Sequence, residues 1–139
     1  MAMTEQNVCD VEKEIQTKLA KKLLDVIILQ LLNAQPMHGY ELISKIRKNF
    51  GVYFGPSTIY PLLSTLEKSA CIISQWDMEK GRPKKVYSLT TEGQDMLVFA
   101  ENSISLLCQK MFPSLISAEE TPAFTKSDTN IGSFTVSGT

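Results

Sequence analysis

The sequence predicts a mainly α-helical fold with a small β-hairpin, and three features of its 139 residues lead to this prediction. Apolar side chains recur every three or four positions in separate stretches of residues 15–69, as in amphipathic helices. Two runs rich in β-forming residues, 71–76 and 84–89, flank a polar loop. Another stretch with helical spacing follows residue 90. Two helices followed by a hairpin are the layout of a winged helix-turn-helix, here with one more helix before it and one after it.

The first helix is predicted from Ile15 to about Asn33, where the chain approaches Pro36 and the helix must end. Its apolar side widens toward its C-terminal half, which predicts burial on more than one side. Residues 1–14 have few large apolar side chains and no clear period. We therefore expect them to form a flexible N-terminal arm.

The next two helices are predicted on either side of residues 51–56. The second helix stops at Gly51, a residue that suits a left-handed cap. The third begins with Ser57 or Thr58 as N-cap and closes near Ser69. Pro61 must lie within about its first turn, because a proline deeper in a helix removes a hydrogen bond and clashes with the preceding turn.

After the hairpin, a fourth helix is predicted to begin at Thr90 or Thr91 and to continue to a stop near Pro113. Its apolar residues recur at intervals of three and four, which is typical of a helix that packs against another helix. We expect this seam to be the interface of a homodimer, formed by Leu97, Ala100, Ile104, Leu107 and Met111. The predicted organisation is thus an arm (1–14), a winged helix-turn-helix domain (15–90), a dimerisation helix (91–112) and a disordered tail (113–139).

The charges are segregated along the chain, although the net charge is only −1. Residues 15–90 hold 11 Lys and Arg against 5 Asp and Glu, whereas both ends carry an acidic excess. A basic middle between acidic ends is expected when one face of a protein meets phosphates.

The start of the third helix carries side chains suited to a DNA groove, namely Ser57, Thr58 and Tyr60. Short polar groups at the N-terminal end of a helix can reach base edges or phosphates without holding the helix away from the groove. The alternative is that Ser57 and Thr58 only cap the helix and that Tyr60 packs inward.

The hairpin tip holds four cations within six residues, Lys80, Arg82, Lys84 and Lys85. A protruding basic loop fits a minor groove or a row of flanking phosphates. On its own such a cluster is more often a solvated turn, but beside a helix-turn-helix it favours DNA contact.

Other chemistry is not indicated. His38 is the only histidine and has no second ligand at metal spacing, so a role at a helix start is favoured, where Glu41 could complete a capping arrangement. Cys9, Cys71 and Cys108 are too few and too scattered for a disulfide framework or a zinc site. No catalytic motif or phosphate loop is present, so we expect neither an enzyme nor a cofactor.

Trp76, at the end of the first hairpin strand, has two interpretations. Packing against the sheet is the simpler one, and lining a ligand pocket at a dimer interface is the alternative. Without an apolar run long enough for a membrane helix, or a basic and then apolar N-terminus, the expected location is the cytoplasm.

Several motifs resemble the phenolic acid decarboxylase regulator (PadR) family of winged-helix transcription factors. The resemblance extends from about Leu23 to about Met96, through the segments Met37–Leu42, Thr58–Lys68, Gly81–Tyr87 and Leu89–Gly93. It is most similar to the branch with a short C-terminal region. Such families often have glycine where Ala70 stands, so the turn there is expected to differ.

The resemblance implies a homodimer whose C-terminal helix packs against the partner, often against its N-terminal helix. It also implies a recognition helix containing Ser57, Thr58 and Tyr60, a wing containing the four cations, an inverted-repeat operator and, usually, repression. A winged helix used only for protein–protein interaction, without specific DNA binding, is the alternative function. The sequence does not identify an operator, the target genes or a small-molecule effector.

Overall fold

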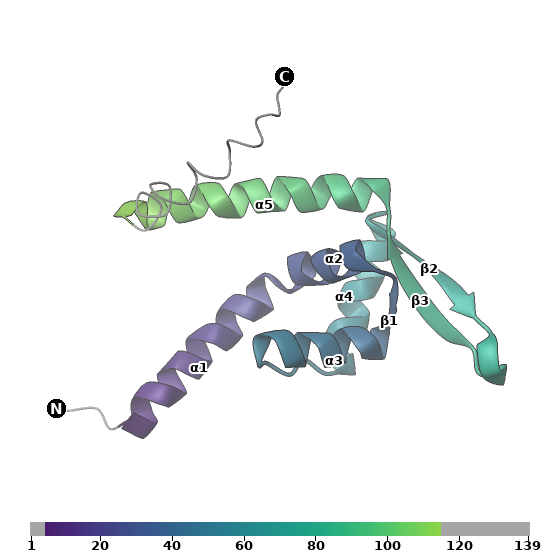
Figure 1. The fold of residues 1–139 in the computed structure, drawn as a ribbon, viewed down its shortest axis with the longest axis horizontal. Coiled ribbons are helices and arrows are strands. Elements are labelled where there is room, and N and C mark those ends of the chain that lie inside the picture. Colours follow the sequence, from purple (N-terminus) through teal and green to yellow (C-terminus); the bar gives the residue numbers. More distant parts are fainter. Residues whose placement is uncertain (1–4, 115–139) are drawn as a thin grey trace, which may run out of the picture. The chain divides into compact units, whose positions relative to one another are not determined.

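A computed structural model describes residues 5–114 of the chain (Figure 1). The chain divides into two compact units, one ending at Val98 and the other beginning at Phe99. This boundary falls within the helix Thr91–Met111.

The described elements are mostly helical. The helices are α1 (Glu5–Lys22), α2 (Leu24–Ala34), α3 (Gly39–Phe50), α4 (Pro56–Lys68) and α5 (Thr91–Met111). The strands are β1 (Met37–His38), β2 (Ile72–Asp77) and β3 (Lys84–Leu89), with a short 3-10 turn, Glu79–Gly81, between β2 and β3. The predicted class, mainly α with a small β-hairpin in a winged helix-turn-helix, is confirmed.

The N-terminal region differs from the prediction in two ways. Residues 5–14, predicted as part of a flexible arm, are helical and belong to α1. Their glutamate, glutamine and lysine content favours a helix by intrinsic propensity. Val8 and Val11 continue the three- and four-residue spacing of Ile15 and Leu19, but two apolar positions alone make a weak period. The predicted single helix is also interrupted at Leu23. The mostly exposed helix α1 ends before this residue, and α2, in which most of the leucines are buried, begins after it.

The ends of α3 and α4 show how local chemistry sets the boundaries. Gly51 has a φ of 71°, and its N–H donates to the carbonyl of Arg47, as expected of a left-handed cap. Helix α4 begins earlier than predicted, with Gly55 rather than Ser57 or Thr58 as N-cap, because Pro56 fits the first helical position. Pro61 consequently lies inside the helix rather than in its first turn.

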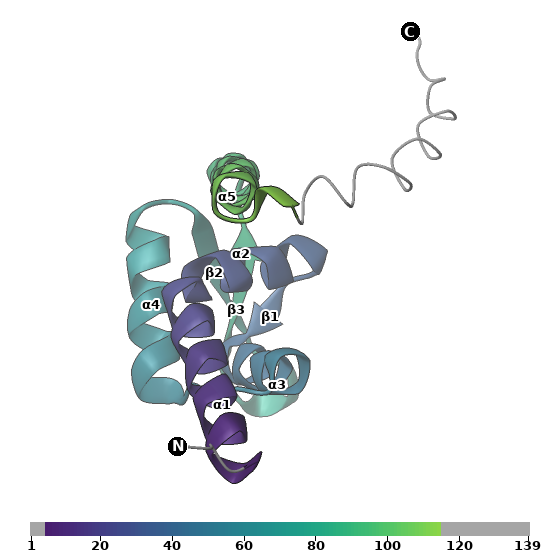
Figure 2. The same ribbon diagram turned by 90° about the vertical axis from the view of Figure 1, so that its left-hand side faces the viewer.

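The sheet has the order β1-β3-β2 and is antiparallel. The hairpin register pairs Ile72 with Leu89 at its base and Asp77 with Lys84 near its tip. Strand β1 was not predicted, because a pair of residues is too short to show a period of two. In Figure 2, α4 and α3 flank the strands, α4 beside β2 and α3 beside β1.

The core of the first unit lies where α2, α3, α4 and the sheet meet. Its most deeply buried side chains are Ile28, Leu29, Leu42, Ile46, Ile59, Leu63 and Ile72. Each contributes about 1.5–3 kcal/mol by leaving water. This packing fixes which face of α4 is buried and therefore which face is presented outward.

The turn between α4 and β2 is held by hydrogen bonds to Thr90. Ala70 adopts a φ of 64°, the left-handed conformation in which glycine is favoured. The Thr90 hydroxyl donates to the Cys71 carbonyl at 2.9 Å and accepts from the Gly93 N–H at 2.9 Å. Thr90 is thus the N-cap of α5, one of the two residues predicted for that role.

Candidate nucleic-acid interface

Helix α4 presents its predicted contact residues on its outer side. Ile59, Leu63 and Leu66 anchor the helix in the core, whereas Ser57 is exposed and Thr58 is half-buried. Tyr60 is 41% exposed, so it neither packs fully inward nor projects freely. The structure therefore leaves Ser57 and Tyr60 exposed and Thr58 partly exposed on this helix.

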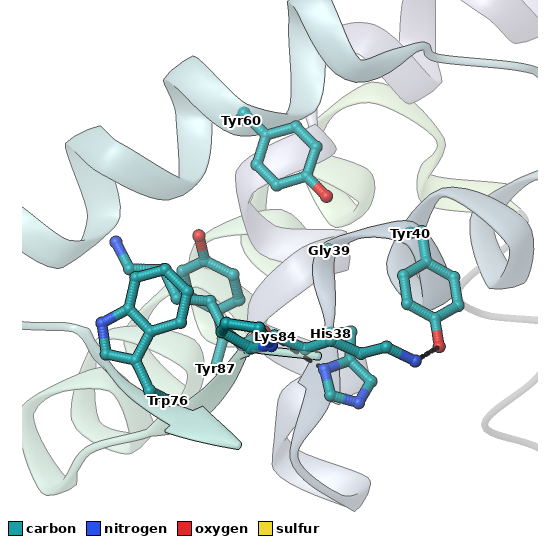
Figure 3. Close-up of a pocket in the computed structure, with 9 residues that line it drawn as sticks. His38, Gly39, Tyr40, Tyr60, Trp76, Lys84 and Tyr87 are labelled. Atoms are coloured by element: carbon teal, nitrogen blue, oxygen red, sulfur yellow. Dashed lines mark hydrogen bonds between the residues drawn. The ribbon is translucent and has the colours of Figure 1, made fainter. Parts of the chain in front are cut away.

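The position of Tyr60 depends on Gly39, the first residue of α3. A Cβ atom on Gly39 would lie 2.5 Å from both the Cε1 and the hydroxyl oxygen of Tyr60. Only a residue without a side chain allows the tyrosine ring to approach the α3 backbone this closely. Figure 3 shows the ring pointing from α4 toward this glycine. The sequence motif at residues 37–42 thus has a structural role in placing a residue of α4.

The wing exposes the cations that were predicted for it. Lys80, Arg82 and Lys84 are exposed, and Lys85 is half-buried. Lys80 and Gly81 both have positive φ, 62° and 69°, which reverses the chain at the tip. In Figure 1 the hairpin of β2 and β3 extends past the helices of the same unit.

A pocket of about 430 Å³ joins the wing to the two helices of the helix-turn-helix (Figure 3). It is rich in aromatic rings and lysines, and its lining residues are His38, Gly39, Tyr40, Tyr60, Trp76, Pro83, Lys84, Lys85 and Tyr87. Trp76 is 63% exposed, with the Lys85 ammonium 5.8 Å from its ring centroid. Trp76 thus lies largely exposed on the hairpin beside its cross-strand neighbour Lys85, and the pocket that it lines is formed within a single chain.

Tyr40 was not predicted as a site residue. Its hydroxyl oxygen lies 3.3 Å from the Lys84 Nζ atom, and its ring is stacked on His38 with 5.4 Å between centroids. The ring Nδ1 atom of His38 lies 3.3 Å from the Lys85 carbonyl oxygen. The backbone N–H of His38 donates to the Glu41 carboxylate at 2.8 Å. The predicted capping role of Glu41 is confirmed. No sequence pattern indicates that Tyr40 and Lys84, 44 positions apart, would meet.

Tyr87 forms the inner wall of the pocket. Burial raises the pKa of its hydroxyl above the usual value, and the negative charge of Glu67 and the neighbouring Tyr60 raise that pKa further. The Glu67 carboxylate is held by the Ser74 hydroxyl at 2.5 Å. Tyr87 accordingly remains protonated and uncharged at neutral pH, and Lys84 and Lys85 supply positive charge to this face.

The predicted dimer seam on α5 is divided by the structure. Leu97 is only 4% exposed and belongs to the core of the first unit, so it is not available to a partner. The period predicted the burial of Leu97 correctly but could not tell an internal partner from an external one. Ala100 and Ile104 are half-buried, whereas Leu107 and Met111 are exposed, as are Phe99 and Leu106, which lie outside the predicted seam.

A metal centre and a membrane-spanning helix are both absent from the described residues. Residues 5–114 contain no cluster of three or more His, Cys, Asp or Glu side chains able to hold a metal ion. None of the helices in this range has the length and hydrophobicity needed to cross a bilayer. The predicted tail, from residue 115 onward, lies outside the described residues, as do residues 1–4 of the predicted arm.

A helix-turn-helix formed by α3 and α4, followed by a two-stranded wing, defines the winged helix-turn-helix class of DNA-binding transcriptional regulators. The chain belongs to the transcriptional regulator PadR-like family, whose family model matches residues 28–98. The resemblance inferred from the sequence motifs is confirmed.

Solved structures agree with this assignment. A PadR family transcriptional regulator from Eggerthella lenta is 28% identical, with a TM-score of 0.68 over 78% of this chain and 95% of that one. A Streptococcus transcriptional regulator is 31% identical, with a TM-score of 0.59 over 68% and 94%. A PadR-like transcriptional regulator from Bacillus cereus is 25% identical, with a TM-score of 0.63 over 70% and 96%. None of the curated proteins matches the sequence.

The contact between Gly39 and Tyr60 can be tested directly. We expect Gly39→Ala to displace the Tyr60 ring and to weaken DNA binding severalfold, while the melting temperature changes little because a flexible side chain can move aside and alanine is the better helix former. Fluorescence anisotropy with labelled DNA measures the affinity. In a Tyr60→Ala background, Gly39→Ala should have no further effect on binding; an equal loss in both backgrounds would show that Gly39 does not act through Tyr60.

Proposed function

We propose that the protein is a homodimeric repressor that binds an inverted-repeat operator and acts in the cytoplasm. In each protomer α4 lies in a major groove, and the wing contacts the adjacent minor groove or its phosphates. The side chains proposed to contact DNA are Ser57, Thr58 and Tyr60 on α4 and Lys80, Arg82, Lys84 and Lys85 on the wing.

One observation carries this proposal. Tyr60 of α4 lines the same pocket as Lys84 and Lys85 of the wing. The exposed face of the recognition helix and the basic wing therefore form one continuous surface rather than two separate ones. A surface that combines groove-reaching hydroxyls with cations matches the two requirements of a DNA site, base contact and phosphate neutralisation.

The geometry of a two-fold dimer constrains the operator. If both recognition helices dock on one face of the duplex, the centres of the half-sites are separated by about 10 base pairs or a multiple of that spacing. Repression follows when such a site overlaps a promoter, because the bound dimer excludes the polymerase.

A gel-shift experiment with the DNA upstream of the protein's own gene tests the proposal. The expected result is a discrete complex that survives competition by unrelated DNA, and a footprint of two related half-sites. A reporter under the same promoter should then be expressed less when the protein is present. A protein that forms a dimer on a sizing column but does not bind this DNA at low salt would instead favour the protein-interaction module.

Exposed apolar side chains support the dimer. In the second unit, Leu107 is 57% exposed, and Phe99, Leu106 and Met111 are similarly exposed. On α1, a stripe spaced by three and four residues is exposed as well, comprising Val8, Val11, Ile15 and Leu19. Long apolar helix faces on a monomer are commonly covered by a partner. The stripe on α1 has the spacing of a surface that packs against another helix.

We expect Leu107→Lys to convert the dimer into a monomer, because an ammonium group cannot be buried in an apolar helix interface without an unpaired charge. Size-exclusion chromatography with light scattering measures the mass. Gln109→Lys, which adds the same charge at another exposed position of α5, is the control and should remain dimeric. An unchanged mass for Leu107→Lys would exclude this part of the helix from the interface.

A further inference from the structure

We propose that Tyr40 and Lys84 together bind one backbone phosphate of the DNA, between the recognition helix and the wing. This inference rests on the proposed function and specifies which group of the DNA reaches the pocket. Tyr40 then becomes a DNA-contacting residue supplied by α3, in addition to those on α4 and the wing.

The two donors are already paired in the protein alone. The Lys84 ammonium donates to the Tyr40 hydroxyl oxygen at 3.3 Å and lies 5.3 Å from the centroid of the same ring (Figure 3). Because the Tyr40 oxygen accepts this bond, its own proton can point elsewhere. The ammonium has two further protons. Both groups are exposed, Tyr40 at 52%, so two donors 3.3 Å apart face the solvent together.

No acid neutralises this pair within residues 5–114, since Lys84 makes no ion pair there. Asp77 is the residue opposite Lys84 in the hairpin, but its carboxylate accepts from the Glu79 N–H at 3.0 Å. The carboxylate of Glu41, in the first turn of α3, accepts a hydrogen bond from the backbone N–H of His38. The charge of Lys84 is thus left for an external anion.

The cluster is also held in place before any ligand arrives. His38 stacks on the Tyr40 ring with 5° between the ring planes, and its Nδ1 atom contacts the Lys85 carbonyl of the wing. A lysine that is ordered by a ring and a hydroxyl loses less conformational entropy when it binds. Such an arrangement favours a small, multiply accepting anion over a planar base edge.

A phosphate is the anion that this surface meets if α4 occupies a major groove. The pocket is bordered by Tyr60 on one side and by the wing on the other, so the groups of a DNA strand that pass it belong to the backbone. Phosphate contacts fix the register of a protein on the duplex without reading sequence. Tyr40 and Lys84 would therefore raise affinity for operator and unrelated DNA alike.

The test uses the full-length protein and two variants. Tyr40→Phe removes the hydroxyl but keeps the ring that stacks on His38, and we expect about tenfold weaker binding for each protomer on DNA, with an unchanged melting temperature. Lys84→Gln should weaken binding similarly at 0.1 M salt and reduce the slope of log K against log salt by about one unit per protomer.

The double variant should lose less affinity than the product of the two single losses, because both groups act on one phosphate. Tyr53→Phe, which removes a hydroxyl from an exposed ring outside the pocket, is the matched control.

The outcomes separate this inference from the proposed function. If the wild-type protein binds no DNA, the proposed function fails. If the wild type binds and Tyr40→Phe binds equally well, the phosphate site is overturned while the regulator function stands. A loss confined to the operator, with unrelated DNA unaffected, would also overturn it, because it would indicate a base contact. Replacing the contacted phosphate of the DNA by a neutral methylphosphonate should weaken binding by the wild-type protein but not by the double variant.

Discussion

DNA binding by the Lys80→Ala/Arg82→Ala variant should be roughly a hundredfold weaker for each protomer at 0.1 M salt, since each lost phosphate contact is worth about one decade there. Both side chains are exposed at the wing tip, and neither forms an ion pair within residues 5–114. Their removal therefore leaves no buried charge behind, and the fold should be unaffected. The slope of log K against log salt should fall by about two units per protomer.

Anisotropy titrations between about 0.05 and 0.3 M salt measure this slope. A control with the same loss of charge is Lys13→Ala/Lys21→Ala on α1, where both lysines are exposed but lie on a different element from the wing. Its affinity should stay close to that of the wild type. Equal losses in the two variants would mean that only the total charge matters, and the wing would have no particular role.

Substitution of Gly93 by alanine should lower the stability of the winged domain by about 2 kcal/mol, which is a drop of about 10 °C in melting temperature for a domain of this size. A Cβ atom on Gly93 would collide with the backbone carbonyl oxygen of Cys71 and would lie 2.6 Å from the Cδ1 atom of Leu89. The carbonyl cannot move away easily, because it accepts hydrogen bonds from the Thr90 N–H at 3.1 Å and the Thr90 hydroxyl at 2.9 Å.

Thermal denaturation followed by circular dichroism measures the effect. Gln94→Ala, at the exposed position that follows the buried Gly93 in the first turn of α5, is the control and should leave the melting temperature nearly unchanged. The gain in helix propensity from glycine to alanine, about 1 kcal/mol, opposes the clash and is included in the expected value. A melting temperature equal to that of the wild type would show that the turn after α4 yields to the added atom.

The wing and the recognition helix were predictable because their signals are local. Strand β3 has the predicted bounds, and β2 begins one residue later than predicted and ends one residue later. Turn residues and alternating apolar residues determine such a hairpin over a few positions. The cations at its tip follow from composition alone. The end of α3 at Gly51 was predictable for the same reason, because the left-handed cap is a property of one residue.

The errors arise where packing competes with local preference. Helix α1 was missed over residues 5–14 because this stretch adds only Val8 and Val11 to the apolar stripe of the helix, and α4 begins at Pro56 because the fixed φ of proline outweighs the capping preference of Ser57. Leu97 was assigned to a partner although it fills the core of its own chain. A heptad pattern records that a residue is buried, but not by what.

By itself, the sequence determined the class of this protein: a winged helix-turn-helix with a cationic wing, in a chain that belongs to the PadR-like regulators. Periodicity, caps and charge depend on residues that are close together in the sequence, so they can be recognised without knowledge of the fold. Only the tertiary structure decided that Gly39 lies under Tyr60 and that Tyr40 meets Lys84. Those contacts join α3 to α4 and to the wing, and their geometry exists only after the core has fixed the angles between these elements.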